Sequence, residues 1–209
     1  MLYHDLSLDR VSGVNGTLLD YDAAQLVQLP AGEPARFGNR FAHVTIEPLS
    51  ALLAILDDYP TATCFVEIKE QTLVSLALDT AITQLCNLFA AHRQQVVLIS
   101  YDTAVIAAAR QQQWPRCGVV LNCLSDALEP AILALQADYY FIDQLLIDPS
   151  FSHQKAPNSA QWVAFEVGDT TTGLKLLNYG FDLLESFTAP TLLAGECDEE
   201  HVAPSSQAS

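Results

Sequence analysis

A series of short apolar runs, separated by helical stretches, constrains the fold of this 209-residue chain more than any other feature. The runs are rich in β-branched and aromatic residues, which is typical of buried strands, and they occupy 62–68, 95–99, 117–121, 138–142, 162–167 and 181–185. The stretches 72–92, 103–112, 126–136 and 170–179 between them have the length and composition of helices. Regular alternation of strands and helices predicts a parallel sheet covered by helices, and therefore an α/β protein.

The amino-terminal part is less regular. Met1–His4 has the character of a strand end, Asp22 is predicted to cap a short helix that reaches about Leu29, and 45–48 is predicted to open a second helix with Pro48 in its first turn. With the first segment included, about seven strands are expected, a number within the usual range of parallel sheets. A doubly wound open sheet accommodates them, and so does an eight-stranded barrel that lacks one strand.

Composition indicates a single domain. The hydrophobic content of 50% suffices for one sizeable core, and no Gly/Ser-rich or Pro-rich run divides the interior. We therefore expect one domain over 1–195, followed by a disordered acidic and Ser/Pro-rich tail over 196–209. No apolar run approaches the roughly 18 residues of a membrane span, and the start of the chain lacks a signal-peptide pattern. The five cysteines show no C-x-x-C spacing, which favours free thiols and a cytoplasmic location.

The formal charge of −16 restricts the possible partners. It argues against nucleic acid bound through phosphates, because those contacts need clustered Lys and Arg. It also means that an anionic small substrate requires a local metal ion or a few focused cationic side chains. A nucleotide fingerprint would need a stricter glycine pattern than the segment 12–16 provides.

Charged residues end the first long apolar run. Glu67 and Lys69 are two positions apart, so in a strand both side chains point to the same face. The carboxyl end of a parallel strand is where ligands bind in α/β proteins. Desolvating charged side chains there costs free energy unless they bind a ligand. The alternative interpretation is a surface ion pair where the strand frays.

In their order along the chain, a set of motifs resembles the glycerophosphodiester phosphodiesterases, which are (β/α)8 barrels of the TIM type. The His-Asp-x-x-Leu-x-Arg pattern and the Glu-Ile-Lys at a strand end are the most specific of them. The matching segments are His4-Asp5-Leu6-Ser7-Leu8-Asp9-Arg10 with Asn15-Gly16-Thr17, Thr45-Ile46-Glu47-Pro48-Leu49, Val66-Glu67-Ile68-Lys69, Ile99-Ser100-Tyr101-Asp102, Phe165-Glu166-Val167-Gly168-Asp169 and Gly180-Phe181-Asp182-Leu183-Leu184.

The resemblance implies an incomplete TIM-type barrel, with the first strand and most of the second absent. It also implies metal-dependent hydrolysis of glycerophosphodiesters to glycerol 3-phosphate and an alcohol, in lipid and glycerol metabolism. His4 matches a catalytic histidine that acts as general acid, and Glu67 matches a carboxylate ligand of Mg²⁺ or Ca²⁺. Lys69 matches the lysine that meets the phosphate, and Phe165 matches an aromatic wall of the substrate site, although a core role is the simpler interpretation.

The family's His-Arg and Glu-x-Asp motifs have no counterpart in the sequence given. Because Mg²⁺ and Ca²⁺ need several oxygen ligands, we expect weak metal affinity and impaired turnover. Either the reading frame begins upstream of Met1, or the chain is an inactive remnant or a binding module for a phosphorylated metabolite. The gap left by missing strands would favour self-association. Asp5 is expected to cap its loop, and the other histidines are expected to be solvated: His43, His92, His153 and His201.

Overall fold

The computed structural model describes residues 1–70, 77–148, 151 and 156–199. The chain divides into two compact units. The first comprises Met1–Cys64 and Gln71–Val96, and the second comprises Phe65–Glu70 and Val97–Ser209. The expected single domain over 1–195 stays a prediction. Among the described helices, none combines the length and the apolar character that crossing a bilayer requires.

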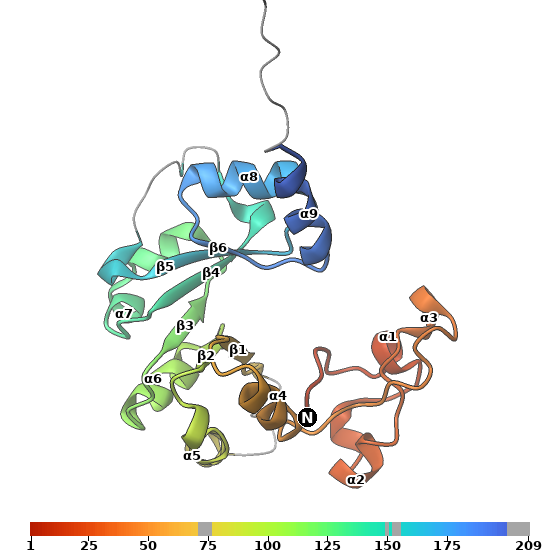
Figure 1. Ribbon diagram of the computed structural model, residues 1–209. Helices are drawn as coiled ribbons and strands as arrows, with labels where there is room; N and C mark the ends of the chain where they lie inside the picture. The colour runs from red at the N-terminus through yellow and green to blue at the C-terminus, as the bar shows by residue number, and fades with distance from the viewer. Residues whose placement is uncertain (71–76, 149–150, 152–155, 200–209) are drawn as a thin grey trace, which may run out of the picture. The chain divides into compact units, whose positions relative to one another are not determined.

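A six-stranded sheet organises the second unit, with the strands in the sequential order β1-β2-β3-β4-β5-β6 (Figure 1). Their bounds are β1 Cys64–Glu67, β2 Val96–Ser100, β3 Cys117–Val120, β4 Tyr139–Asp143, β5 Gln161–Phe165 and β6 Leu183–Leu184. Strands β2 to β6 pair in parallel. A doubly wound sheet would reverse its strand order at a switch point, so the sequential order confirms the α/β fold of the barrel type and excludes the doubly wound alternative. Each strand lies within or beside the segment predicted for it.

Alternating residues give the sheet two apolar faces. On one face a buried cluster forms from β2 to β5, and Phe65 and Phe165 pack against it: Val97, Ile99, Val120, Tyr139, Phe141 and Val163. Phe65 contacts Tyr139 and Phe141 edge-on, at centroid distances of 5.0 and 5.2 Å. Trp162 belongs to the other face and contacts Tyr140 and Phe151. Burial on both sides explains why the strands read as continuous apolar runs.

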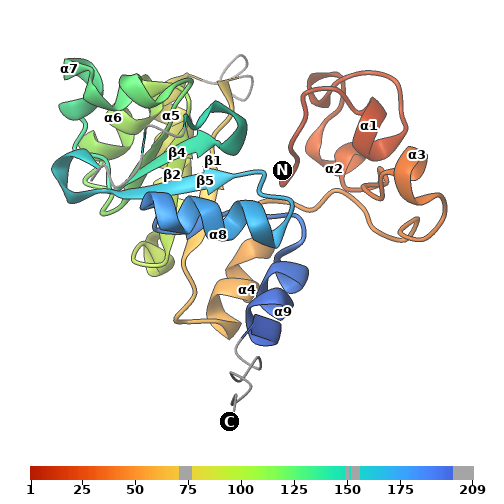
Figure 2. The ribbon, with the colours of Figure 1, turned by 90° about the horizontal axis from the view of Figure 1, so that it is seen from above.

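Helices follow the strands where the sequence places them. Helix α6 (Thr103–Gln111) is capped by the Asp102 side chain, and α8 (Thr170–Tyr179) by that of Asp169. Both helices match their predicted ranges, and α8 lies beside β5 in the two ribbon views (Figures 1 and 2). Gly180, at φ 101°, ends α8 in the left-handed region.

Two predicted segments of the second unit differ from the structure. The helix expected over 126–136 is divided into a 3₁₀ turn, η4 (Leu124–Leu128), and α7 (Pro130–Leu133), because the proline ring restricts the preceding residue to extended backbone. Helix α9 runs over Ala189–Glu199, so the first residues of the expected disordered tail, 196–199, are helical. The rest of that tail, 200–209, lies outside the described residues.

Short helices and isolated bridges build the first unit around Leu8, Leu26 and Ile46. Helix α2 begins after Asp22, as predicted, and its cap accepts from the Gln25 backbone N–H at 2.9 Å. The helices are α1 Asp9–Ser12, η1 Leu18–Asp20, α2 Ala23–Leu26, α3 Pro34–Phe37, α4 Ala51–Asp58, α5 Leu78–Leu88 and η3 Ala90–His92; the second unit adds η5 Gln144–Leu146 and η7 Pro157–Ser159. The start of the helix predicted over 72–92 lies outside the described residues.

The prediction that a helix opens at 45–48 is wrong. Thr45 bridges Pro30 and Glu47 bridges Leu2, both antiparallel, and the helix begins only at Ala51. The Ile46 side chain is buried between these bridges, and its backbone N–H donates to the Leu29 carbonyl at 3.0 Å. Burial of Ile46 therefore holds this segment extended, and a local helix signal cannot compete with that tertiary contact.

Candidate functional site

Glu67 and Lys69 form an ion pair at the carboxyl end of β1. The Lys69 Nζ lies 2.7 Å from a Glu67 carboxylate oxygen, and each side chain keeps 26% of its surface exposed. Two hydrogen bonds fix the residue between them, because the Ile68 N–H donates to the Ile99 carbonyl at 2.8 Å and the Ile68 carbonyl accepts from Ser100 Oγ at 2.7 Å. The buried hydroxyl of Ser100 thus anchors the backbone that presents both charges toward the edge of the sheet.

Further carboxylates gather near this edge. The pKa of Tyr101, which directly follows β2, is raised first by burial and then by the negative charges of Glu67, Asp143, Glu166 and Glu185. Asp143 ends β4, Glu166 follows β5 and Glu185 follows β6. The carboxyl ends of these strands therefore form an acidic rim around the phenol.

No sequence motif marks Asp143, Glu166 or Glu185 as site residues. The available signal was their common position, directly at or after the end of a predicted strand. Glu166 also has φ 61°, a left-handed conformation that a non-glycine residue adopts at a cost. Such backbone strain is enriched at functional positions, but the sequence does not reveal it.

Phe165 ends β5 on the face of the barrel-type sheet that carries the buried cluster. It is half-buried and packs against that cluster. The contact agrees with the core role that we considered the simpler interpretation. Its role as a wall of a substrate site stays a prediction.

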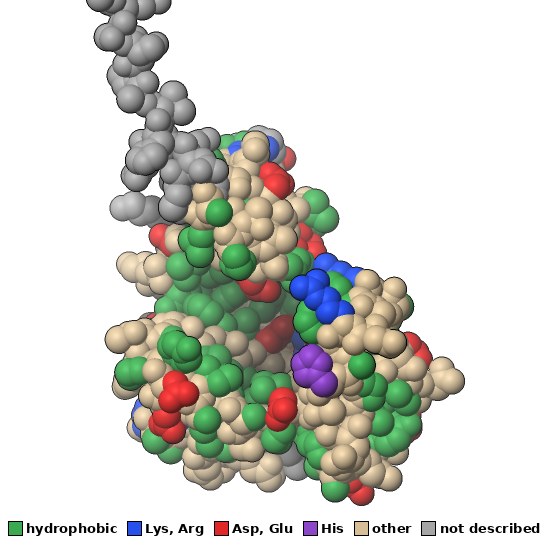
Figure 3. Space-filling model, turned by 45° about the vertical axis from the view of Figure 1, so that its right-hand side comes forward, with side chains coloured by type: hydrophobic (Ala, Val, Ile, Leu, Met, Phe, Trp, Pro, Cys, Tyr) green, Lys and Arg blue, Asp and Glu red, His purple; other side chains and the backbone are tan. Residues whose placement is uncertain are grey.

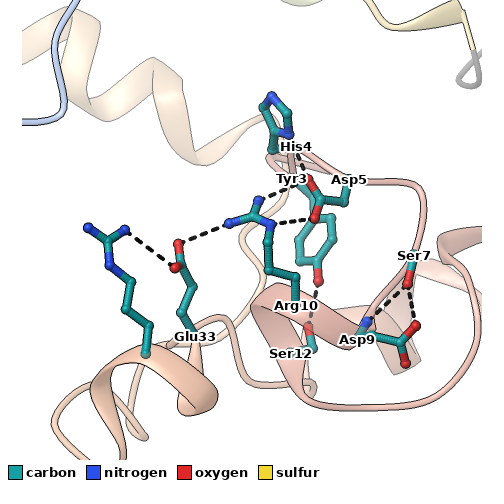
Figure 4. A network of polar contacts seen from close by, with 9 residues as sticks. Tyr3, His4, Asp5, Ser7, Asp9, Arg10, Ser12 and Glu33 are labelled. Atoms are coloured by element: carbon teal, nitrogen blue, oxygen red, sulfur yellow. Dashed lines mark hydrogen bonds and ion pairs between the residues drawn. The ribbon is translucent and has the colours of Figure 1, made fainter. Parts of the chain in front are cut away.

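His4 lies in the first unit, at the end of a chain of alternating charges (Figure 4). Its Nδ1 is 2.6 Å from Asp5 Oδ1, and its side chain is 70% exposed. Arg10 donates two hydrogen bonds to the Asp5 carboxylate, from Nε at 2.7 Å and from Nη2 at 2.9 Å. Glu33 lies 3.3 Å from Arg10 and 3.6 Å from Arg36. His4 is thus tied through Asp5 to Arg10 and to the loop that carries Glu33.

The Arg10 contact changes the chemistry of Asp5. Hydrogen bonding to Arg10 is the largest cause that lowers the pKa of Asp5 to about 2, and the His4 ring adds to it. The expectation that Asp5 caps its loop is therefore corrected: its carboxylate pairs with Arg10 and His4 because both lie within reach of its two oxygens.

The other described histidines lie apart from this network. His92 is only 12% exposed and lies 3.4 Å from Asp57, so the expectation that it is solvated is wrong. It ends η3, and the Gln95 side chain also contacts its Nδ1 at 3.0 Å. His43 is exposed, as expected, while His153 and His201 lie outside the described residues.

The donor set fits poorly to a Mg²⁺ or Ca²⁺ ion. In the described part of the chain, no group of three or more His, Cys, Asp or Glu side chains is arranged to hold a metal. Glu67 has an ammonium as its neighbour, whereas these ions require several oxygen ligands. The residues that the structure brings together therefore do not form a metal centre.

Basic side chains are few, and their location is uneven. In Figure 3, a group of Lys and Arg atoms lies next to a histidine on the visible face, while acidic and hydrophobic side chains are spread more widely. Arg36 and Arg40 each lie over a neighbouring aromatic ring, Phe37 and Phe41 respectively. These two rings in turn contact each other edge-on at 5.2 Å.

Comparison with solved structures identifies the fold. A phosphodiesterase from Oleispira antarctica, in complex with the product sn-glycerol-3-phosphate, aligns with a TM-score of 0.78 at 20% identity, over 93% of this chain and 78% of that one. The fold is that of the glycerophosphodiester phosphodiesterases. A protein from Silicibacter pomeroyi DSS-3 described as a glycerophosphoryl diester phosphodiesterase gives 0.78 at 13% identity, over 95% and 78% of the two chains.

A further solved structure has the same fold, whereas comparisons at the level of sequence find no match. A glycerophosphodiester phosphodiesterase from Agrobacterium tumefaciens aligns with a TM-score of 0.67 at 15% identity, over 92% of this chain and 79% of that one. No family model and no curated protein sequence matches this chain. The similarity is therefore carried by three-dimensional structure, and it confirms the incomplete TIM-type barrel predicted from the sequence motifs.

Proposed function

We propose that this protein is a glycerophosphodiester phosphodiesterase-like protein that acts on a small phosphodiester. The observation that carries the proposal is the Glu67–Lys69 pair, fixed by Ser100 at the carboxyl end of a strand in a sheet of this fold. A lysine that is focused there offers a phosphate an attractive point charge in an otherwise acidic protein. The bound product of the Oleispira antarctica phosphodiesterase supports the same ligand class.

In the proposed reaction, water attacks phosphorus and the bond from phosphorus to the alcohol oxygen breaks. The products are glycerol 3-phosphate and the free alcohol. The attacking water releases one proton to solvent, and the departing alkoxide takes one up. In the second unit, Lys69 is the residue that would hold the phosphate oxygens. In the first unit, His4 matches the family's general acid, whose protonated ring donates from Nε2. His4 then carries a neutral ring that a solvent proton recharges.

We further propose that turnover is slow. Glu67 supplies one carboxylate, and the Lys69 ammonium beside it repels a second cation. Mg²⁺ or Ca²⁺ would therefore bind weakly here, and we derive no step that depends on either ion. Free thiols at Cys64, Cys86, Cys117 and Cys123 support a reducing, cytoplasmic location.

A binding module for a phosphorylated metabolite is the second candidate. The observation that favours it is the same pair, because a lysine can bind phosphate where the carboxylates do not form a metal centre. Self-association remains part of this proposal, since β1 and β6 end the strand order and could pair with another chain. Sedimentation of the purified chain at several concentrations tests it, and a single monomer mass throughout would refute it.

Two measurements on one preparation separate the candidates. Thermal unfolding is followed with glycerol 3-phosphate, with and without Mg²⁺ or Ca²⁺, and release of glycerol 3-phosphate from glycerophosphocholine is followed in the same buffers. Slow release that Lys69→Gln abolishes supports the enzyme, and a raised Tm without release supports the binding module. The matched control is Lys175→Gln, which removes an exposed lysine that lies over Tyr179. A chain that shows neither response would contradict both candidates.

A further inference from the structure

We propose that Arg10 is a positioning residue for His4. Arg10 donates two hydrogen bonds to the Asp5 carboxylate and so orients it, and this carboxylate accepts the hydrogen bond from Nδ1–H of the imidazole. The functional consequence rests on the proposed phosphodiesterase reaction, in which Nε2 of His4 would exchange the proton. The ring orientation itself does not depend on that reaction.

Geometry fixes which nitrogen carries the proton. The contact between His4 Nδ1 and Asp5 Oδ1, at 2.6 Å, needs one proton between the two atoms. Arg10 keeps the Asp5 carboxyl ionised well below neutral pH, since it lowers the pKa of that group to about 2. An ionised carboxylate only accepts hydrogen bonds. His4 Nδ1 must therefore be the donor, and in the neutral ring the lone pair lies on Nε2.

Arg10 determines where that carboxylate points. Its Nε and Nη2 bind different oxygens of Asp5, and such a planar, bidentate contact fixes orientation as well as charge. Oδ1 is shared between Arg10 and His4, so a rotation of the carboxylate would break both contacts. In Figure 4 the Asp5 side chain lies between the imidazole and the guanidinium.

Arg10 is supported in turn by a residue distant in sequence. Glu33 forms an ion pair with Arg10 at 3.3 Å, and its backbone N–H donates to the Val11 carbonyl at 2.9 Å. Its φ of 46° is unfavourable for a glutamate, and the surrounding contacts must offset that cost. The loop before α3 therefore helps to hold the guanidinium in place.

The test is the tautomer of His4, read by long-range ¹H–¹⁵N correlation of the imidazole rings at a pH where they are neutral. His4→Gln assigns the signal. We expect the native chain to show the form protonated at Nδ1, and Arg10→Gln to show the mixture of a solvated histidine. Arg10→Lys keeps the positive charge but lacks the planar guanidinium with its two parallel donors, so we expect an intermediate tautomer ratio. The matched control, Arg40→Gln, removes an arginine that stacks on Phe41 and should leave the His4 signal unchanged.

Three outcomes would overturn the proposal: a native ring protonated at Nε2, an Arg10→Gln ring that keeps the native tautomer, or an Arg40→Gln ring that changes as much as Arg10→Gln. Near-UV circular dichroism verifies that each variant is folded, and Arg10→Lys supplies the comparison if Arg10→Gln is not. If the chain hydrolyses glycerophosphocholine, we expect Arg10→Gln to lower kcat about tenfold with little change in KM. Absence of hydrolysis would count against the proposed function and leave the tautomer result valid.

Discussion

At the residue scale, pairing of charges is the main theme of both candidate groups. Lys69 sits beside Glu67 at a strand end, and Arg10 sits beside Asp5 next to His4. Each carboxylate is partly withdrawn from water, so its interaction with the cation exceeds that of a fully exposed pair. The consequences for stability and for ionisation can be measured separately.

Replacing Lys69 with Gln should destabilise the fold. The change leaves the half-buried Glu67 carboxylate without its cation, and we expect a loss of about 1–2 kcal/mol in the free energy of unfolding. Urea unfolding measures it. Lys175→Gln, on the exposed surface of α8, should change the same quantity by less than about 0.5 kcal/mol. Equal losses in the two variants would show that the Glu67–Lys69 contact contributes nothing specific.

Asp5 should titrate far below an ordinary aspartate. Its folded pKa is lowered to about 2 from the 3.8 of an unperturbed aspartate, so its contribution to stability is complete above pH 4 and is lost as the pH falls toward 2. Carbon-detected NMR of the Asp5 carboxyl checks the value, and Arg10→Gln should raise the pKa because Arg10 is the largest cause. The Asp5–Arg10 ion pair contributes about 1 kcal/mol or less to the free energy of unfolding, since Arg10 is half exposed. An unchanged pKa in Arg10→Gln would contradict the assignment.

At the element scale, strands and helices use their glycines differently. Gly118 lies in β3 between two neighbouring strands, whereas Gly173 lies inside α8. A Cβ at Gly118 would be 3.0 Å from Ile99 Cγ2 and 3.1 Å from Tyr139 Cβ, both held in the buried cluster. A Cβ at Gly173 would meet the end of the Leu184 side chain at 3.2 Å, and it would lie 3.7 Å from Val167 Cγ1, which is ordinary van der Waals contact.

The two glycines should therefore respond in opposite directions to alanine. Gly118→Ala overpacks the sheet and should cost about 1–3 kcal/mol of unfolding free energy. Gly173→Ala gains helix propensity of up to about 1 kcal/mol and displaces only a flexible methyl, so it should be neutral or stabilising. Chemical denaturation of the matched pair provides the measurement. A tolerated alanine at Gly118 would mean that β2 and β4 are less tightly packed around β3.

At the scale of the whole molecule, the net negative charge is the main electrostatic influence on the stability of the fold. The formal charge of −16 on 209 residues makes the compact state repel itself. The few basic groups, including Arg10, Arg36 and Arg40, offset that repulsion only locally. Screening by salt should therefore stabilise the fold more than it weakens the individual ion pairs.

Stability should rise with ionic strength. Between about 10 and 300 mM NaCl the screening length falls from about 30 Å to below 8 Å, which removes most long-range repulsion. We expect the urea midpoint to increase over this range. A neutral osmolyte at equal osmolality serves as the control for non-electrostatic effects. A midpoint that falls as NaCl is added would indicate that the ion pairs matter more than the net charge.

The sequence by itself determined the order and type of the elements in the second unit, because buried strands and capped helices leave strong local patterns. It also singled out Glu67, Lys69 and His4 as candidate site residues through motif resemblance, and their roles stay a prediction. Only the tertiary structure decided that 45–48 is extended, that Glu67 pairs with Lys69, that Asp143, Glu166 and Glu185 share the rim of Tyr101, and that Glu33 reaches Arg10. The physical reason is that these features depend on contacts between residues distant along the chain, whose energies no local pattern encodes.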